Sequence, residues 1–430
     1  MTIDMTREQV PVAIGGCDAS TLARTYGTPL YAYDEDGLRG TCRGYASAFQ
    51  AAWPRVSVAY ACKAFATSAM LHLASEEGLG VDVMSPGELS LAIRARVPPT
   101  SITYHGVAKT ADEIGQAVAA RAGHVVIDSI EEVDDIAAVA ARLGRRQPVL
   151  ARINPGVGVA TDPKYCTSGG QSKFGLGIGD GMARRAVLAA LAAQHLRLDG
   201  IHFHLGSQIM DSGPYVQAMK VTAAFLADLP QWRPAMVVAG GGMGVRYGDG
   251  PAAPSPGAWA AAIGGAFSHL LAPACAPDVI LGIEPGRSVV AGHGSTLYTV
   301  GAVKRDSGRP DEATVVVDGG LSDNPRPLMY SAVHEVVPAS VSPGQATETA
   351  HIYGRHCETD LLFGGVTLPR TSRGDVLVVR DTGAYTYCMA SNYNRFARPA
   401  VVFARGGASR LVVRRETLAD VLGTDLGTCA

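Results

Sequence analysis

Short runs of β-branched residues alternate with alanine-rich segments between about residue 56 and residue 283 of this chain. In one of these segments Val133, Ile136, Val139 and Leu143 form an apolar stripe with helical spacing, and Gly144 follows as a stop. The alternation predicts an α/β protein made of strand–helix units. The eight predicted strands span 56–61, 81–84, 102–104, 124–127, 149–153, 198–204, 236–239 and 279–283.

The starts of three helices are marked by hydroxyl residues that stand three positions before a glutamate. These pairs are Ser85 with Glu88, Thr110 with Glu113, and Ser129 with Glu132. That spacing allows the hydroxyl and the carboxylate to cap the helix reciprocally, in a capping box. We therefore expect Ser85 and Glu88 to serve as capping residues.

Eight strand–helix units in succession favour a (β/α)8 barrel over an open sheet. An open dinucleotide-binding sheet would carry a glycine fingerprint after its first strand, and none follows residue 61. After about residue 292 helical spacing becomes rare, which predicts a second, β-rich domain. Its predicted strands are 297–303, 314–317, 376–379, 400–404 and 411–414, the last two flanking the turn-like segment 405–409.

Composition narrows the class of ligand. Basic and acidic residues number 37 and 39, and no run of one sign suggests a surface for nucleic acid or acidic lipid. We therefore expect a small-molecule ligand, with no nucleic-acid or membrane partner. The charged N-terminus lacks an apolar signal core, and no membrane-length apolar run occurs, so we expect a cytoplasmic protein. Eight scattered cysteines without metal-site spacing favour reduced thiols.

Reactive groups of barrel enzymes gather where strands end, so the residues at these positions are candidates for a site. The first strand ends in Tyr-Ala-Cys-Lys63. A partly desolvated lysine amine there suits Schiff-base chemistry, although a solvated loop lysine is the alternative. Asp82 lies within the second strand, and Arg152 and Asn154 close the fifth; each is either a core residue or a supporting polar group.

The segment Ile-His202-Phe-His204-Leu-Gly-Ser207 ends the sixth strand. Alternation along a strand places both imidazoles on one side. A metal site is a rival interpretation, but no third histidine or carboxylate stands at a convincing spacing, and we predict no metal. Ser207 instead opens a series of possible phosphate donors at the late strands, where barrels bind phosphate.

Two further strand ends complete this group. The glycines Gly240, Gly241 and Gly242 follow the seventh strand and can bring backbone N–H groups close to a phosphate, although glycines also make ordinary turns. The eighth strand ends in Glu284-Pro-Gly286-Arg287, which presents a carboxylate and a guanidinium at a rigid corner.

One ligand accounts for a lysine, a histidine, a glutamate and a phosphate cup together, namely pyridoxal phosphate (PLP). In this interpretation Lys63 forms the Schiff base, His204 stacks on the ring and Glu284 faces the pyridinium nitrogen. The predicted cofactor contacts are Lys63, Asp82, His204, Ser207, Gly240, Gly241, Gly242, Glu284, Gly286 and Arg287.

At these residues the sequence resembles the alanine-racemase-fold PLP decarboxylases, and specifically the diaminopimelate decarboxylases. The resemblance covers nearly the whole chain. Its markers are Tyr60 to Phe65, His202 to Gln208, Gly240 to Gly242, Glu284 to Arg287, Asp318 to Asn324, Arg326 to Tyr330, His356 to Glu358, Gly383 to Tyr385 and Ser391 to Asn394. So many motifs in this order are highly specific.

The resemblance implies a PLP-binding barrel, residues 30–291, and a β-sandwich or β-barrel-like domain that combines 1–29 with 292–430. It also implies a homodimer with shared active sites. Tyr385 would join the phosphate ligands, and Arg287, Arg326, Tyr330 and Tyr385 would bind the substrate. Cys357, as proton donor, and Glu358, as a substrate contact, would come from the other subunit.

The activity implied by this resemblance is decarboxylation of meso-2,6-diaminopimelate to L-lysine. The family usually has Cys-Glu-Ser, one further residue and Asp, whereas this chain has the shorter Cys357-Glu358-Thr359-Asp360. A paralogue that acts on a related or carrier-bound amino acid is therefore the alternative. A racemase of the same fold and a non-catalytic PLP-binding homologue are two further readings; the homologue would be expected to lack Lys63 or Cys357.

Overall fold

The chain forms two compact units in the computed structural model, which describes residues 10–159, 167–169, 172–341 and 345–427. Unit 1 contains Met1–Leu38, Arg246–Pro251 and Val290–Ala430, and unit 2 contains Arg39–Val245 and Ala252–Val289. These limits differ by a few residues from the predicted boundaries at 29/30 and 291/292.

Unit 2 is a closed barrel of eight parallel strands, as the alternation of strands and helices predicted. Each strand pairs with the next in chain order, and the last pairs with the first. Val126, Leu150, Met236 and Val238, from three of these strands, pack together in one buried cluster. The strands are β5 (Val56–Ala61), β6 (Gly80–Val83), β7 (Ile102–Tyr104), β8 (His124–Ile127), β9 (Gln147–Asn154), β11 (Leu196–His202), β12 (Met236–Val238) and β13 (Ile280–Ile283); the short β10 (Leu176–Gly177) adds to β9.

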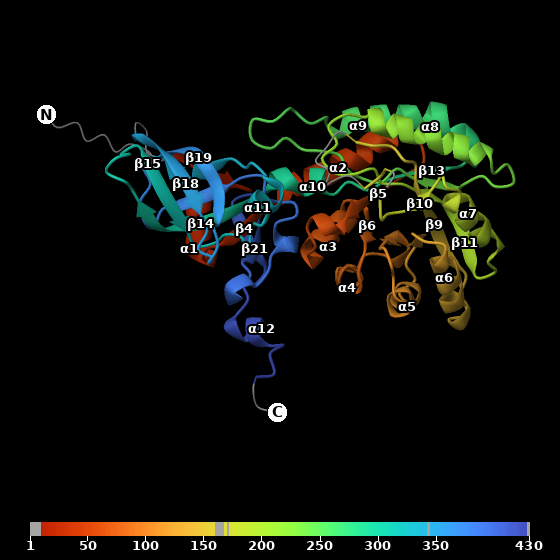
Figure 1. Ribbon diagram of the computed structural model, residues 1–430, viewed down its shortest axis with the longest axis horizontal. Helices are drawn as coiled ribbons and strands as arrows, with labels where there is room; N and C mark the ends of the chain where they lie inside the picture. Colours follow the sequence, from red (N-terminus) through yellow and green to blue (C-terminus); the bar gives the residue numbers. More distant parts are fainter. Residues whose placement is uncertain (1–9, 160–166, 170–171, 342–344, 428–430) are drawn as a thin grey trace. The chain divides into compact units, whose positions relative to one another are not determined.

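Helices alternate with these strands and surround the barrel (Figure 1). In α9 Ser255 Oγ accepts a hydrogen bond from Ala258 N and a proline follows the cap, a common way to start a helix. The helices are α2 (Glu35–Ala52), α3 (Ser68–Glu76), α4 (Pro86–Arg94), α5 (Ala111–Ala119), α6 (Glu131–Arg142), α7 (Met182–Ala192), α8 (Gly213–Ala227), α9 (Pro256–Ala266) and α10 (Arg287–Val290).

Two of the three predicted helix starts are capped by their hydroxyl residue. Thr110 and Glu113 form the complete box at α5, and Ser85 Oγ accepts from Glu88 N at α4. The third prediction was wrong, because α6 has Ile130 at its N-cap with no side-chain cap. Glu132 is instead held by a buried lysine, Lys109, whose Nζ lies 2.7 Å from Glu132 Oε2.

The sixth barrel strand ends two residues earlier than predicted, at His202 rather than His204. Phe203 N still donates to Val238 O of the neighbouring strand. The carbonyl oxygens of His204 and Leu205 instead accept hydrogen bonds from Thr167, so they no longer face a strand partner. His204 therefore belongs to the loop at the end of the strand.

Unit 1 is mostly sheet, which agrees with the predicted β-rich second domain. The path of its main sheet is β19-β18-β15-β14-β4-β21-β22, with β20 pairing β14 and β16. Its strands are β4 (Leu30–Asp34), β14 (Gly294–Lys304), β15 (Glu312–Val317), β16 (Val336–Pro338), β18 (Thr347–Tyr353), β19 (Leu361–Pro369), β20 (Val376–Val379), β21 (Ala400–Arg405) and β22 (Ala408–Val413).

Smaller elements complete unit 1. The predicted hairpin between β21 and β22 turns at Gly406 and Gly407, which both have positive φ. Further elements are the two-residue pairs β1 (Val10–Pro11) with β17 (Ser340–Val341) and β2 (Ala13–Ile14) with β3 (Cys17–Asp18), the helices α1 (Ala19–Tyr26), α11 (Arg326–Tyr330) and α12 (Leu418–Leu422), and short 3-10 helices at Ala291–His293, Tyr387–Met389 and Tyr393–Arg395.

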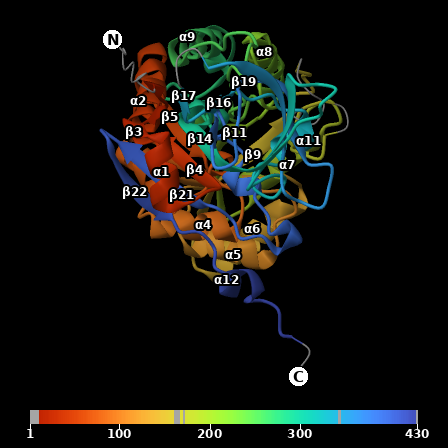
Figure 2. The ribbon, with the colours of Figure 1, turned by 90° about the vertical axis from the view of Figure 1, so that its left-hand side faces the viewer.

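Strand β4 corrects the predicted first boundary. The prediction gave residues 30–34 to the barrel, but β4 pairs antiparallel with β14 and parallel with β21, both in unit 1. Figure 2 shows red β4 beside blue β21, although the two strands are far apart in the sequence. The N-terminal part of unit 1 thus extends through Leu38.

No helix in the described part of the chain is both long and apolar enough to cross a membrane.

Candidate active site

A cavity of ≈ 280 Å³ opens at the carboxyl ends of the barrel strands. Lys63 reaches it from the short 3-10 helix Cys62–Ala64, directly after β5, while His202 and His204 reach it from β11 and the following loop. Both imidazoles thus face the cavity, as the strand alternation predicted. The lining residues are Lys63, Asp82, Met84, Glu88, His105, Gly106, Val107, Arg152, Thr167, Lys173, Phe174, His202, His204 and Glu284.

Both carboxylate oxygens of Glu284 are hydrogen-bonded to histidines. Its Oε1 lies 3.1 Å from His105 Nε2, and its Oε2 lies 2.9 Å from His202 Nε2. All three side chains are buried. Burial alone would raise the pKa of Glu284, but the two imidazoles outweigh burial and hold this pKa well below its usual value. The carboxylate is therefore kept ionised.

His105, which the sequence analysis missed, stands directly after β7. Its Nε2 is also 3.4 Å from Asp82 Oδ1, so it lies between two carboxylates. Its position in the sequence could have identified it. A histidine directly after a barrel strand lies at the same end of the barrel as Lys63 and Glu284.

A metal centre was rejected from the sequence because no third ligand was evident. The structure supplies further candidates, since ligand atoms of His105, His202 and Glu284 lie within 4.8 Å of one another. Each imidazole Nε2 nevertheless points at a Glu284 oxygen and forms a hydrogen bond with it. We interpret the three residues as a hydrogen-bonded network rather than as a metal centre.

His204 sits differently from His202. Its Nδ1 accepts a hydrogen bond from Gly241 N at 3.2 Å, which fixes the ring against the glycine turn. Burial, followed by the nearby Lys63 and Arg152 cations, lowers the pKa of His204 well below its usual value. The ring is therefore neutral and suited to stacking on a flat ligand.

The glycine turn after β12 is packed too closely for side chains. A Cβ on Gly241 would lie 1.9 Å from Glu284 O, and one on Gly242 would lie 2.3 Å from Gly206 O. Nearby, Ser207 Oγ lies 3.0 Å from Arg287 Nη2. Gly286 packs against Ala61 and Ala64, so a side chain at this position would clash with them. The predicted phosphate residues of the barrel therefore stand on adjoining strand ends.

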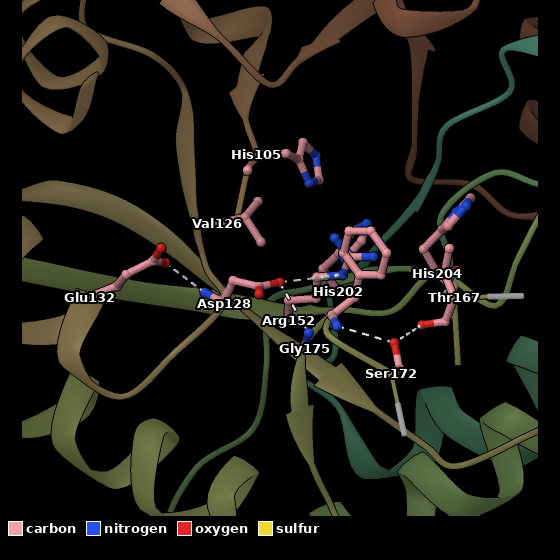
Figure 3. A network of polar contacts seen from close by, with 12 residues as sticks. His105, Val126, Asp128, Glu132, Arg152, Thr167, Ser172, Gly175, His202 and His204 are labelled. Atoms are coloured by element: carbon pink, nitrogen blue, oxygen red, sulfur yellow. Dashed lines mark hydrogen bonds and ion pairs between the residues drawn. The ribbon is translucent and has the colours of Figure 1, made fainter. Parts of the chain in front are cut away.

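A buried charged network lies beside the cavity (Figure 3). Glu132 pairs with Lys109 and accepts a hydrogen bond from Asp128 N at 2.8 Å. Asp128 Oδ1 lies 3.7 Å from Arg152 Nε, and the Arg152 guanidinium stacks on Phe174 at 4.7 Å. This network fixes the Arg152 cation where it lines the cavity.

Glu88 was predicted only to cap α4, but it also lines the cavity. Its Oε2 accepts a hydrogen bond from Met84 N at 2.9 Å. Burial is the main cause that raises the pKa of Glu88 to about 7. Asp82, also buried, has a raised pKa, chiefly because of its burial.

The remaining predicted residues lie in unit 1. Arg326 is buried, with its guanidinium 5.2 Å from the Tyr330 ring and 5.8 Å from the Tyr385 ring. The structure thus brings together three predicted substrate or cofactor contacts from α11 and the loop after β20. Tyr385 has φ +57, which is uncommon for a residue other than glycine.

Cys357 and Glu358 lie on an exposed loop between β18 and β19. A buried hydrogen-bonded pair closes this loop, with His356 Nδ1 2.6 Å from Asp360 Oδ2. Glu358 Oε1 accepts a hydrogen bond from Tyr393 OH at 2.5 Å. The loop is therefore ordered around its two predicted functional side chains.

The barrel matches the family model of the pyridoxal-dependent decarboxylases, pyridoxal binding domain, over residues 39–291. Diaminopimelate decarboxylase of Bacillus subtilis is 39% identical over 420 residues, covering 96% of this chain and 94% of that protein. The Mycobacterium tuberculosis diaminopimelate decarboxylase is 39% identical over 433 residues, covering 98% and 96%. This chain belongs to the diaminopimelate decarboxylase family.

A solved structure of this family agrees. The diaminopimelate decarboxylase of M. jannaschii, crystallised in complex with L-lysine, is 33% identical with a TM-score of 0.87, covering 95% of this chain and 94% of that one. The similarity to that structure extends over nearly the whole chain, and the barrel of this chain is the unit that the pyridoxal-dependent family model describes.

Proposed function

We propose that this protein is a PLP-dependent carboxy-lyase that converts meso-2,6-diaminopimelate to L-lysine and carbon dioxide. The observation that carries this proposal is the convergence of Lys63, His204 and Glu284 on one cavity at the barrel mouth. The near full-length similarity to diaminopimelate decarboxylases supports the substrate.

The residues of the barrel fit PLP. A lysine amine, a neutral imidazole and an ionised carboxylate line the cavity, and the Ser207–Arg287 pair and the glycine turn stand at the neighbouring strand ends. Lys63 would hold the aldehyde carbon, His204 the ring face and Glu284 the ring nitrogen. Asp82 would support this end of the ring through His105, while Ser207, Gly240 to Gly242, Gly286, Arg287 and Tyr385 would bind the phosphate.

When bound, PLP supplies an electron sink for the electron pair that remains when the substrate loses its carboxylate. Glu284 sustains that sink, because an ionised carboxylate keeps the ring nitrogen protonated. The Lys63 amine would give way to the substrate amine. The Cys357 thiol, which the resemblance places in a partner subunit, would supply the proton that replaces the lost carboxylate, and Lys63 would then release the product.

By the family resemblance, Arg287, Arg326, Tyr330 and Tyr385 would bind the substrate. Arg326, Tyr330 and Tyr385 form one cation–aromatic cluster, which suits a substrate carboxylate. Glu358 of the partner subunit would bind the distal ammonium group, so we also propose a homodimer with shared active sites in the cytoplasm.

The shortened Cys357–Asp360 loop bears on substrate choice, so the experiment compares substrates. The purified, PLP-loaded protein is offered meso-diaminopimelate, ornithine, lysine and arginine separately, and amine products are identified by mass spectrometry. We expect L-lysine from meso-diaminopimelate and at most traces of amine from the others. Turnover only of another amino acid would reject the substrate but keep the decarboxylase, and no carbon dioxide from any substrate would reject both.

A further inference from the structure

His105 occupies an unusual place, between two buried carboxylates. Its Nε2 lies 3.1 Å from Glu284 Oε1 and 3.4 Å from Asp82 Oδ1, and all three side chains are less than a tenth exposed. The His105 imidazole therefore lies between the Asp82 and Glu284 carboxylates, whose mutual repulsion is little screened by water. The net charge of the three groups therefore depends on the proton of His105.

His202 contacts the same glutamate but has a different environment. Among the described residues it contacts one carboxylate, Glu284, through Nε2 at 2.9 Å, and its ring lies edge-on to the His105 ring with centroids 4.8 Å apart. Two imidazolium ions at that separation in a buried site would repel each other strongly. One of the two histidines is therefore neutral.

Several charges decide which histidine carries the proton. Asp82 and Glu284 face His105 and favour its cation, while Arg152 disfavours it; together these effects exceed the cost of burial and raise the pKa of His105. For His202, burial prevails over Glu284 and lowers the pKa to about 4, with His105 and Arg152 adding to the decrease. The proton thus resides on His105, and His202 is neutral.

Removing that cation would leave Asp82 and Glu284 as neighbouring buried carboxylates. Such pairs relieve their repulsion by taking up a proton. If Glu284 takes up the proton, it can no longer hold a ring nitrogen in its protonated form. Lys63 also acts on this balance, because its positive charge favours the ionised form of Asp82.

We propose that His105 is a positioning residue whose imidazolium, held between Asp82 and Glu284, keeps the Glu284 carboxylate ionised and oriented for the cofactor. This inference rests on the proposed function of the barrel. It gives the Asp82–His105 pair a role that acts through Glu284 rather than through the substrate.

The test compares His105→Asn with Asp82→Asn, with the double variant, and with His72→Asn as control. His72 lies on α3 with a side chain that is 56% exposed. The readouts are the dissociation constant of PLP for each apoprotein, the absorption spectrum of each PLP-loaded protein between pH 6 and 9, and kcat and KM separately.

We expect His105→Asn to weaken PLP binding about 10- to 100-fold, the range of one charge-assisted hydrogen bond. The visible absorption band should shift or lose intensity, and kcat should fall more than KM rises. The double variant lacks the Asp82 carboxylate, so Glu284 has no neighbouring negative charge that would favour its protonation. Its PLP affinity should therefore recover at least threefold relative to His105→Asn, while His72→Asn matches the wild type.

Wild-type affinity and spectrum in His105→Asn would overturn the proposal. A double variant that binds PLP no better than His105→Asn would also overturn it. Additive losses of affinity would mean that the two side chains contribute through packing and not through charge. Loss of PLP affinity in the wild type after treatment with a chelator would assign the three groups to a metal instead. If His105→Asn does not fold, as judged by circular dichroism, His105→Gln is measured by the same criteria; its amide donates a hydrogen bond without a charge.

The lysine assay of the wild type separates the role of His105 from the proposed reaction. The wild type is assayed for lysine formation in the same series, so an active wild type beside an unaffected His105→Asn removes only the role of His105. An inactive wild type that still binds PLP removes the proposed reaction and leaves the affinity comparison valid.

Discussion

His202 Nε2 and Glu284 Oε2 lie 2.9 Å apart, although 82 residues separate them in the chain. They stand at the ends of β11 and β13, with β12 between. His204, two residues beyond His202, instead receives a hydrogen bond from the glycine turn. The two histidines therefore serve different partners at the same barrel mouth.

His204→Ala should impair the protein more than His202→Ala. Loss of the His204 ring removes the proposed stacking surface. Loss of His202 removes one hydrogen bond to Glu284, and His105 still bonds the same carboxylate. We expect PLP affinity to fall at least fivefold further in His204→Ala, as measured by titration of the apoproteins. Equal losses in the two variants would contradict this assignment.

Lys63→Ala should abolish both turnover and the visible absorption of the lysine-bound cofactor, because among the described residues no other lysine stands within two residues of the carboxyl end of a barrel strand. Spectra of the variant after incubation with PLP test this. The chain offers Lys173, which also lines the cavity, as a matched control, and Lys173→Ala should keep the band. A normal band in Lys63→Ala would assign the Schiff base to another residue.

Glu132→Gln should destabilise the protein by about 3–5 kcal/mol, because it leaves the buried Lys109 cation without its partner. Unfolding in urea, followed by circular dichroism, measures the free energy. The exposed pair Arg309–Glu312 is the control, and Glu312→Gln should change stability by less than about 1 kcal/mol. Similar small effects in both variants would mean that Lys109 finds another partner.

Glu88→Gln should alter the pH dependence of stability of the apoprotein. The pKa of Glu88 is raised to about 7 in the folded protein, so its neutral form is favoured there. The folded protein therefore loses stability as pH rises from the unfolded value of ~4.5 to about 7. Glu88→Gln lacks this loss, and its melting temperature should exceed that of the wild type increasingly between pH 5 and pH 8. A constant difference would show that Glu88 titrates normally.

Tyr393→Phe should raise KM for meso-diaminopimelate several-fold with little effect on PLP affinity. The substitution removes the hydroxyl that holds Glu358, while the buried His356–Asp360 pair still closes the loop. Steady-state kinetics and PLP titration separate these effects. An unchanged KM would indicate that Glu358 needs no support from Tyr393.

The barrel could be predicted because each strand carries β-branched residues and most helices carry local start and stop signals. Lys63, His204 and Glu284 could be found because each stands within two residues of the end of a strand. His105 occupies the same kind of position, but β7 is only three residues long and no neighbouring motif marks its end. Its importance depends on Glu284, 179 residues away in the chain.

Tertiary partners explain the other differences. Glu132 has the spacing of a capping residue, yet Lys109, 23 residues earlier, recruits it into a buried pair. The segment 30–34 begins with Leu-Tyr-Ala-Tyr and precedes a helix, so it resembles a first barrel strand. Only its pairing with β14 and β21 places it in the other sheet. Local patterns predict elements well, but they do not predict which distant chain segment an element joins.

Decarboxylation is tested by the stoichiometry of the reaction with meso-diaminopimelate. The PLP-loaded wild type is incubated with carboxyl-labelled substrate, and released carbon dioxide and L-lysine are quantified together, with Lys63→Ala as blank. We expect one carbon dioxide for each L-lysine formed and neither product in the blank. Consumption of meso-diaminopimelate without carbon dioxide, as in racemisation, or recovery of unchanged substrate would reject the proposed decarboxylation.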